Sequence, residues 1–190
     1  MKWIKVKPDV RTYVIQAIVG TAVFALVLVF DLVTKYVTEG MDRLWIIEGV
    51  LSFVSVHNTG GAWSMFNDNA VVMTIIKVFT FIFVAAALIV MYYPDGRKNA
   101  FFIVTLALLG SGALGNLIDR LAFGYVRDFI RFDIINFPVF NIADVALVTG
   151  VIMLIVYIIW QFVHSERKAR QEKKDAENAS ESDADGGDGK

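Results

Sequence analysis

Four long apolar segments, separated by shorter polar stretches, dominate the pattern of this 190-residue chain. They cover approximately residues 13–33, 70–93, 100–118 and 142–163. Each is close to the ~20 residues with which an α-helix crosses a hydrocarbon core about 30 Å thick. A single segment inside lipid can satisfy its own backbone hydrogen bonds only as a helix. The pattern therefore predicts an integral membrane protein with four transmembrane helices.

The basic residues predict how these helices are oriented. Lys and Arg gather before the first span, in the connection 94–99, and after the fourth span. An even number of spans places all three regions on one side of the membrane, and the positive-inside rule makes that side the cytoplasm. We therefore expect both termini in the cytoplasm. The longer connections 34–69 and 119–141, with any site that they carry, are expected outside.

The C-terminal region differs from the rest in composition. Residues 175–190 hold six acidic residues and one lysine, so the net charge of −1 conceals a basic remainder. A segment with few apolar side chains cannot bury enough surface to fold on its own. We divide the chain into a membrane domain, residues 1–164, and a charged cytoplasmic tail, residues 165–190, which we expect to be disordered.

Composition also removes several classes of function. The chain has no cysteine, which excludes disulfides, thiol catalysis and Cys-ligated metal sites. It has no concentrated basic stripe of the kind that binds nucleic acid, so no nucleic-acid partner is expected. The candidates for function are therefore the few polar residues within and between the spans.

The outer end of the first span carries an acid and a base. Asp31 and Lys35 are four residues apart, so their side chains can meet on one helix face. A charge at the centre of a membrane helix costs roughly 2.5–3.5 kcal/mol, so such residues need a reason to be there. The pair either helps the helix to end at the interface or supports a site at the outer leaflet, and the spacing alone favours neither.

A second group of polar residues lies at the end of the third span. Gly112, Asn116, Asp119 and Arg120 follow one another at spacings that place them on one helix face. Small residues there permit a tight helix crossing, and a polar end is ordinary for a span. An amide on such a face nevertheless needs partners inside the protein, which favours a further role for Asn116.

Two more acids, Asp128 and Asp144, follow in the last connection and the start of the fourth span. Asn141 can cap that helix, and Asp144 suits its positive N-terminal end, which is one interpretation. The other is that Asp128 and Asp144 converge and share a proton, since two close carboxylates do not both ionise easily. One could then act as general base on water while the other polarises a carbonyl. His57 is a weaker candidate for a catalytic base.

Five short blocks together resemble the lipoprotein signal peptidase (signal peptidase II) family over about residues 20–163. They are residues 31–35, 58–64, 112–120, 126–129 and 140–144. Three positions depart from the residues usual in that family. Gly61 stands where Ala is frequent, Trp63 where Phe is frequent, and Arg127 where a small apolar residue is usual.

The resemblance implies an aspartic endopeptidase of the bacterial cytoplasmic membrane, with four transmembrane helices and a small extracytoplasmic β-sheet cradle. Asp128 and Asp144 would be its catalytic residues, near the extracytoplasmic face. The substrate would be a prolipoprotein whose Cys already bears diacylglycerol, cut immediately before that Cys, with membrane lipid as the other partner. Neither a metal nor an organic cofactor is implied. Seven residues would bind the substrate or support the site: Asn58, Asn116, Arg120, Asn141, Asp31, Lys35 and Gly112.

Two other classes of function remain as alternatives. A proton- or ion-coupled carrier would also place polar residues among its helices, but near the membrane midplane and often within internal repeats. Here the acids gather at one end of the spans, and no repeat is visible. A non-enzymatic scaffold would explain the small residues of the third span but not the Asn, Asp and Arg beside them.

Overall fold

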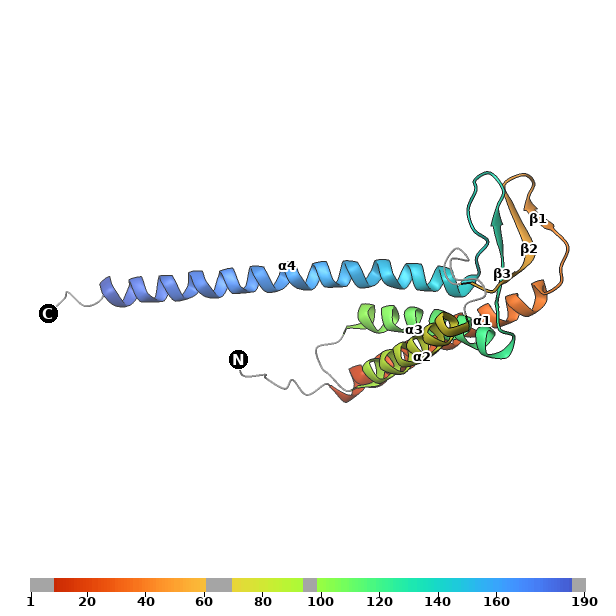
Figure 1. Cartoon of the computed structure of the whole chain (residues 1–190). Helices are drawn as coiled ribbons and strands as arrows, with labels where there is room; N and C mark the ends of the chain where they lie inside the picture. The colour runs from red at the N-terminus through yellow and green to blue at the C-terminus, as the bar shows by residue number, and fades with distance from the viewer. Residues whose placement is uncertain (1–8, 61–69, 94–98, 186–190) are drawn as a thin grey trace. The chain divides into compact units, whose positions relative to one another are not determined.

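The computed structural model describes residues 9–60, 70–93 and 99–185. The chain divides into two compact units, Met1–Ile152 and Met153–Lys190. Figure 1 shows the elements. In chain order they are α1 (Val10–Thr38), β1 (Leu44–Ile47), β2 (Leu51–Asn58), α2 (Ala70–Tyr92), α3 (Ala100–Ala122), β3 (Val126–Phe132) and α4 (Ile142–Asp185).

The predicted fold class, four transmembrane helices with a small sheet, is confirmed. In the described part of the chain, four helical stretches are long and apolar enough to cross a membrane: Val10–Thr38, Ala70–Tyr92, Ala100–Ala122 and Ile142–Glu172. The first continues beyond its predicted end at residue 33, so Lys35 belongs to the helix and not to the connection.

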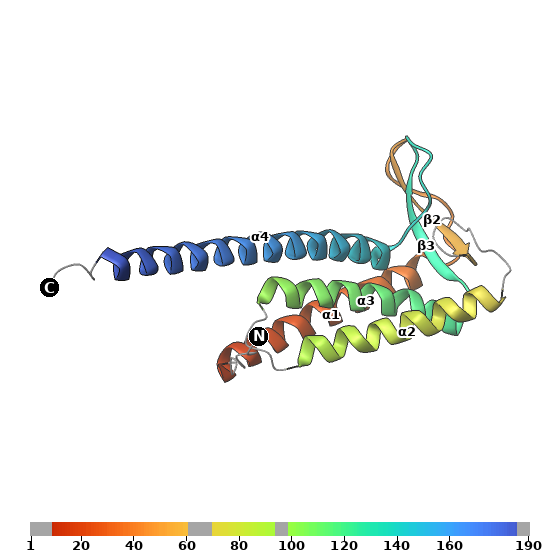
Figure 2. The same cartoon turned by 60° about the vertical axis from the view of Figure 1, so that its left-hand side comes forward.

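Helix α3 is the central helix of the first unit. It contacts both α1 and α2, and Figure 2 shows the three running side by side. Of its most apolar stretch 61% is buried, against 6% for α1 and 17% for α2. Because lipid tails are as apolar as these side chains, α1 and α2 can expose them to the bilayer. Helix α3 instead faces protein.

Two glycines of α3 permit the close contacts that the sequence predicts for this helix. A Cβ on Gly112 would lie 2.5 Å from the backbone oxygen of Ala143, and one on Gly115 would lie 2.5 Å from Asp31 Oδ2. The absence of side chains here lets the start of α4 and a carboxylate of α1 come this close. Three helices therefore meet at one place near the end of α3.

The strands form one antiparallel sheet in the order β1-β2-β3. It lies at the end of the first unit where α1 and α3 finish and α4 begins (Figures 1 and 2). In the pairing of β2 with β3, Val56 stands opposite Asp128. After β3 the chain turns back, and Phe140 exchanges backbone hydrogen bonds with Ile130. That return places the start of α4 beside β3.

In the second unit, α4 continues as a helix to Asp185, whereas the sequence predicts a disordered tail from residue 165. The segment is rich in Ala, Glu, Lys and Arg, which have high helix propensity. Lys168 with Glu172 and Arg170 with Glu166 form ion pairs one turn apart, at 3.9 and 3.7 Å. A shortage of apolar residues argues against packing but not against a helix, which explains the difference. Residues 186–190 lie outside the described part.

Replacing Gly112 by Ala is expected to destabilise the protein. The new Cβ would meet a backbone oxygen of α4 at 2.5 Å. Overpacking of this kind typically costs about 1–3 kcal/mol, so the melting temperature in detergent should fall. Gly110→Ala is the matched control, because its Cβ would first meet the ring of Phe24 at 3.0 Å, and a side chain can turn away. Equal melting temperatures for the two variants would contradict the tight packing of α3 on α4.

Candidate active site

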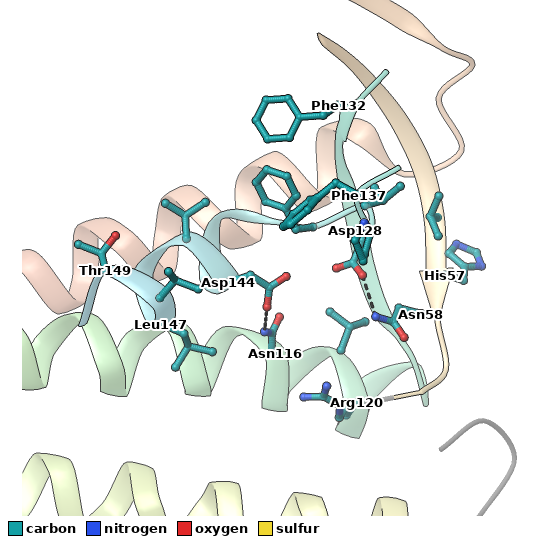
Figure 3. Close-up of a pocket in the computed structure, with 17 residues that line it drawn as sticks. His57, Asn58, Asn116, Arg120, Asp128, Phe132, Phe137, Asp144, Leu147 and Thr149 are labelled. Atoms are coloured by element: carbon teal, nitrogen blue, oxygen red, sulfur yellow. Dashed lines mark hydrogen bonds between the residues drawn. The ribbon is translucent and has the colours of Figure 1, made fainter. Parts of the chain in front are cut away.

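Asp128 and Asp144 border the same cavity. Asp128 lies in β3 and is 3% exposed, whereas Asp144 lies in the first turn of α4 and is half-buried. The cavity has a volume of about 780 Å³, and its polar wall also includes Asn58, Asn116 and Arg120 (Figure 3). The sequence separation of the two acids left their convergence open. The return of the chain after β3 brings them together.

Asn141 and Asp144 cap the start of α4 reciprocally. The Asn141 Oδ1 accepts from the backbone N–H of Asp144 at 2.9 Å, and Asp144 Oδ2 accepts from the backbone N–H of Asn141 at 3.1 Å. This is a capping box, which satisfies two backbone donors that a helix start leaves free. The structural interpretation of this pair therefore holds. The other carboxylate oxygen, Asp144 Oδ1, accepts a hydrogen bond from Asn116 Nδ2 at 2.7 Å.

The Asn141 side chain also reaches the second acid. Its Nδ2 donates to Asp128 Oδ1 at 2.6 Å, while Asn58 Nδ2 donates to Asp128 Oδ2 at 2.9 Å. Each carboxylate thus accepts one hydrogen bond on each of its oxygens. Because Asn141 contacts both acids, it fixes the position of one with respect to the other.

The surroundings of Asp128 favour its protonated form. Burial, and then the negative charge of Asp144, raise the pKa of Asp128 to about 7. The hydrogen bonds from Asn58 and Asn141 and the charge of Lys35 act in the opposite direction but do not outweigh burial. Near neutral pH the pair therefore holds a proton that it can give or take, which is the requirement for acid and base chemistry in one site.

Arg120 supplies a positive charge to the same cavity. It comes from the last turns of α3. Its positive charge is attracted by Asp119, Asp128 and Asp144. Its Nε is buried and has no hydrogen-bond partner among the described residues. Because a buried donor normally has a partner, this guanidinium is suited to bind an oxygen atom of a ligand.

Beneath the cavity, the predicted contact between Asp31 and Lys35 is present and fully buried. Lys35 Nζ lies 2.8 Å from Asp31 Oδ2 and 3.4 Å from Asp119 Oδ2, and it donates to Asn116 Oδ1 at 3.0 Å. Asp31 Oδ1 accepts from the backbone N–H of Ala143 at 2.8 Å. The pair therefore holds both Asn116 and the first turn of α4, so it does more than end the helix.

Sequence reasoning missed one group of contacts beside the site. Arg127 forms an ion pair with Asp119 at 2.7 Å, and His57 Nε2 lies 2.7 Å from Glu39 Oε1. The spacing of these residues follows neither a helix nor a strand period. The signal in the sequence that could have pointed to these contacts was Arg127, a charged residue where a small apolar one is usual. The other two unusual positions, Gly61 and Trp63, lie outside the described residues.

Among the described residues, no group of three or more His, Asp or Glu side chains is placed to hold a metal ion. The polar wall of the cavity instead offers two carboxylates, carboxamides, one guanidinium and the imidazole of His57. Such a set suits proton transfer and the binding of polar oxygen atoms. That the protein needs no cofactor stays a prediction.

Comparison with known proteins gives consistent matches. A family model described as Signal peptidase (SPase) II matches residues 23–160. Proteins named lipoprotein signal peptidase are similar to the chain. That of Enterococcus faecalis is 35% identical over 81% of this chain and 92% of its own length, and that of Staphylococcus aureus is 37% identical over 78% and 91%. Two solved structures described as bacterial membrane enzymes have TM-scores of 0.65 and 0.62 at 34% and 35% identity. They cover 82% of this chain and 92% and 97% of their own.

Asp128 is expected to exchange a proton near pH 7. In pH-difference infrared spectra, a protonated carboxyl band should grow as the pH falls through about 7, because burial and the charge of Asp144 favour protonation. Asp128→Asn should lose this band. Asp42→Asn, which replaces an exposed acid, should keep it. A band that survives in Asp128→Asn would assign the proton to another group.

Proposed function

Because this chain belongs to the signal peptidase II family, we propose that it removes the signal peptides of prolipoproteins through Asp128 and Asp144. Family membership makes it a membrane-embedded aspartic peptidase, and its four apolar helices make it a multi-pass membrane protein. The observation that supports this choice of residues is that Asn141 hydrogen-bonds both acids at the wall of one cavity. The carrier alternative loses its basis, since Asp128 lies in a strand outside the spans.

The two acids divide the chemistry according to their burial. Asp128 is the more buried, so it holds the proton and donates a hydrogen bond to the oxygen of the scissile carbonyl. Asp144 takes a proton from a water molecule, whose oxygen attacks the carbonyl carbon. The tetrahedral intermediate then collapses as the C–N bond breaks, and the proton that Asp144 took from the water passes to the leaving nitrogen. The products are a new carboxyl end on the signal peptide and a free amine on the lipidated Cys.

The rest of the cavity suits an apolar, membrane-bound substrate. Its wall continues from the acids along Phe132, Phe137 and Phe140 and along Val145 and Val148 of α4. Arg120 is close enough to the acids to bind a peptide carbonyl next to the scissile bond. A diacylglyceryl Cys remains anchored in the bilayer, so its scissile bond can reach only a site near the membrane surface. Anchoring of this kind orients the bond before reaction.

Asp128→Asn and Asp144→Asn should each abolish most cleavage of a diacylglyceryl-modified prolipoprotein. Asn is nearly isosteric with Asp but cannot exchange the proton, and general acid–base catalysis contributes about 10²–10⁴-fold. The double variant should be little worse than either single one, because the two acids act as one unit. Cleavage by the purified proteins is followed by the mobility shift of the substrate.

Asp133→Asn is the matched control for these variants. It changes an acid just beyond β3 that pairs with Arg43 and Arg131 and does not line the cavity. Its activity should stay near that of the wild type. The same substrate without its diacylglyceryl group should remain largely uncut. Turnover near the wild-type level in a well-expressed Asp128→Asn or Asp144→Asn protein would refute the assignment.

The site is proposed to lie on the extracytoplasmic side. The sheet and the start of α4, which carry the two acids, lie at the end of the first unit where α2 begins (Figures 1 and 2), and the basic connection 94–99 follows the other end of α2 in the sequence. Reporter fusions after Lys98 and after Lys168 should therefore report the cytoplasm, and fusions near Asp68 should report the outside, as basic loops remain inside. An outside signal at Lys98 would reverse this orientation.

A further inference from the structure

Arg127 immediately precedes Asp128 and is held by a single buried carboxylate. Its backbone N–H donates to Asp119 Oδ2 at 3.0 Å, its Nε to the same oxygen at 3.3 Å, and its Nη2 to Asp119 Oδ1 at 2.7 Å. The Arg127 side chain is 12% exposed and that of Asp119 is 0% exposed. A two-pronged contact between guanidinium and carboxylate is strong and directional. Asp119 thus fixes both the backbone and the side chain of Arg127.

This contact balances the charge beneath the cavity. Asp31 and Asp119 are both fully buried and share one cation, Lys35, at 2.8 and 3.4 Å. Among the described residues, Lys35 and Arg127 are the bases that form ion pairs with Asp31 and Asp119, so without Arg127 the two directly paired acids would share a single positive charge. A buried charge without a partner is strongly unfavourable. The guanidinium of Arg127 removes that excess.

The same contacts lead to both catalytic acids. Lys35 donates to Asn116, and Asn116 in turn donates to Asp144. Asp119 also fixes Arg127, which immediately precedes Asp128 in the chain. A change in the charge or position of Asp119 is therefore transmitted to Asp128 and Asp144 by separate routes.

We propose that Arg127 is a positioning residue of the peptidase reaction, which holds Asp128 in place and neutralises Asp119 beneath the catalytic pair. This rests on the proposed function of Asp128 and Asp144. Arg127 is also secured on its outer side, where its Nε lies 3.7 Å from Glu39 and its guanidinium lies 4.6 Å from the centre of the Phe123 ring. These contacts limit its freedom to leave Asp119.

The other ionisable groups around the pair come from all the elements packed at this end of the first unit. A loss of positive charge at Arg127 is expected to move the pH dependence of catalysis upward, because the remaining excess of negative charge favours protonated carboxyls. The groups around Asp128 and Asp144 are Asp31 and Lys35 of α1, Glu39 after it, His57 of β2, Tyr125 before β3, Arg127 of β3, and Asp119 and Arg120 of α3.

The test compares Arg127→Leu with Arg127→Lys in the full-length protein, using a diacylglyceryl prolipoprotein. Arg127→Leu should lower kcat by about tenfold or more, because β3 then keeps only the backbone hydrogen bond to Asp119 and loses the two side-chain bonds that hold it beside Asp128. It should also shift the pH profile of kcat/KM upward by roughly half a unit. Arg127→Lys keeps the charge but not the two-pronged contact, so it should lower kcat and leave the profile in place. Arg131→Leu, on the same strand but 45% exposed, should change neither.

A double variant distinguishes an effect of charge from an effect of misfolding. Asp119→Asn with Arg127→Leu removes both charges, so its pH profile should return to that of the wild type even though its kcat stays low. A wild-type profile in Arg127→Leu, or a shifted one in Arg127→Lys, would overturn the proposal. An active Asp128→Asn protein, measured in the same series, would instead refute the proposed function itself.

Discussion

The ammonium group of Lys35 is the constraint on which the site depends. It has no exposed surface, and a charge in that position is tolerated only when it is closely paired. Its partners come from two helices: Asp31 from α1, and Asn116 and Asp119 from α3. Their positions are therefore fixed together. Since Asp31 also binds the first turn of α4, one lysine determines how three helices meet beneath the cavity.

Short polar contacts of this kind require helices that approach closely. Gly115 leaves room for the Asp31 carboxylate, and Gly112 leaves room for the backbone of Ala143. Side chains at these two places would push α1 and α4 away from α3 and lengthen every hydrogen bond between them. The small residues and the buried charges therefore depend on each other, because the small residues allow the helices to come as close as the buried ion pairs and hydrogen bonds require.

Sequence alone predicted the parts of this arrangement that depend on local spacing. Span lengths and the contact of Asp31 with Lys35 follow from helix geometry, and the cap formed by Asn141 follows from residue preferences at helix starts. The meeting of Asp128 with Asp144 depends on the return of the chain after β3, which no periodicity encodes. Family resemblance supplied that pairing. The contact between Asp119 and Arg127 depends on the same tertiary geometry and was therefore missed.

The capping box at the start of α4 has a consequence for how inhibitors of this peptidase could be designed. Asp144 serves at once as a proposed reacting group and as the residue that closes the first turn of a membrane helix with Asn141. A substitution at either position that removes the side-chain oxygen disturbs both the proposed chemistry and helix initiation. A compound that binds through these two side chains would therefore leave the bacterium few routes to resistance, because each escape mutation would weaken the enzyme it was meant to protect.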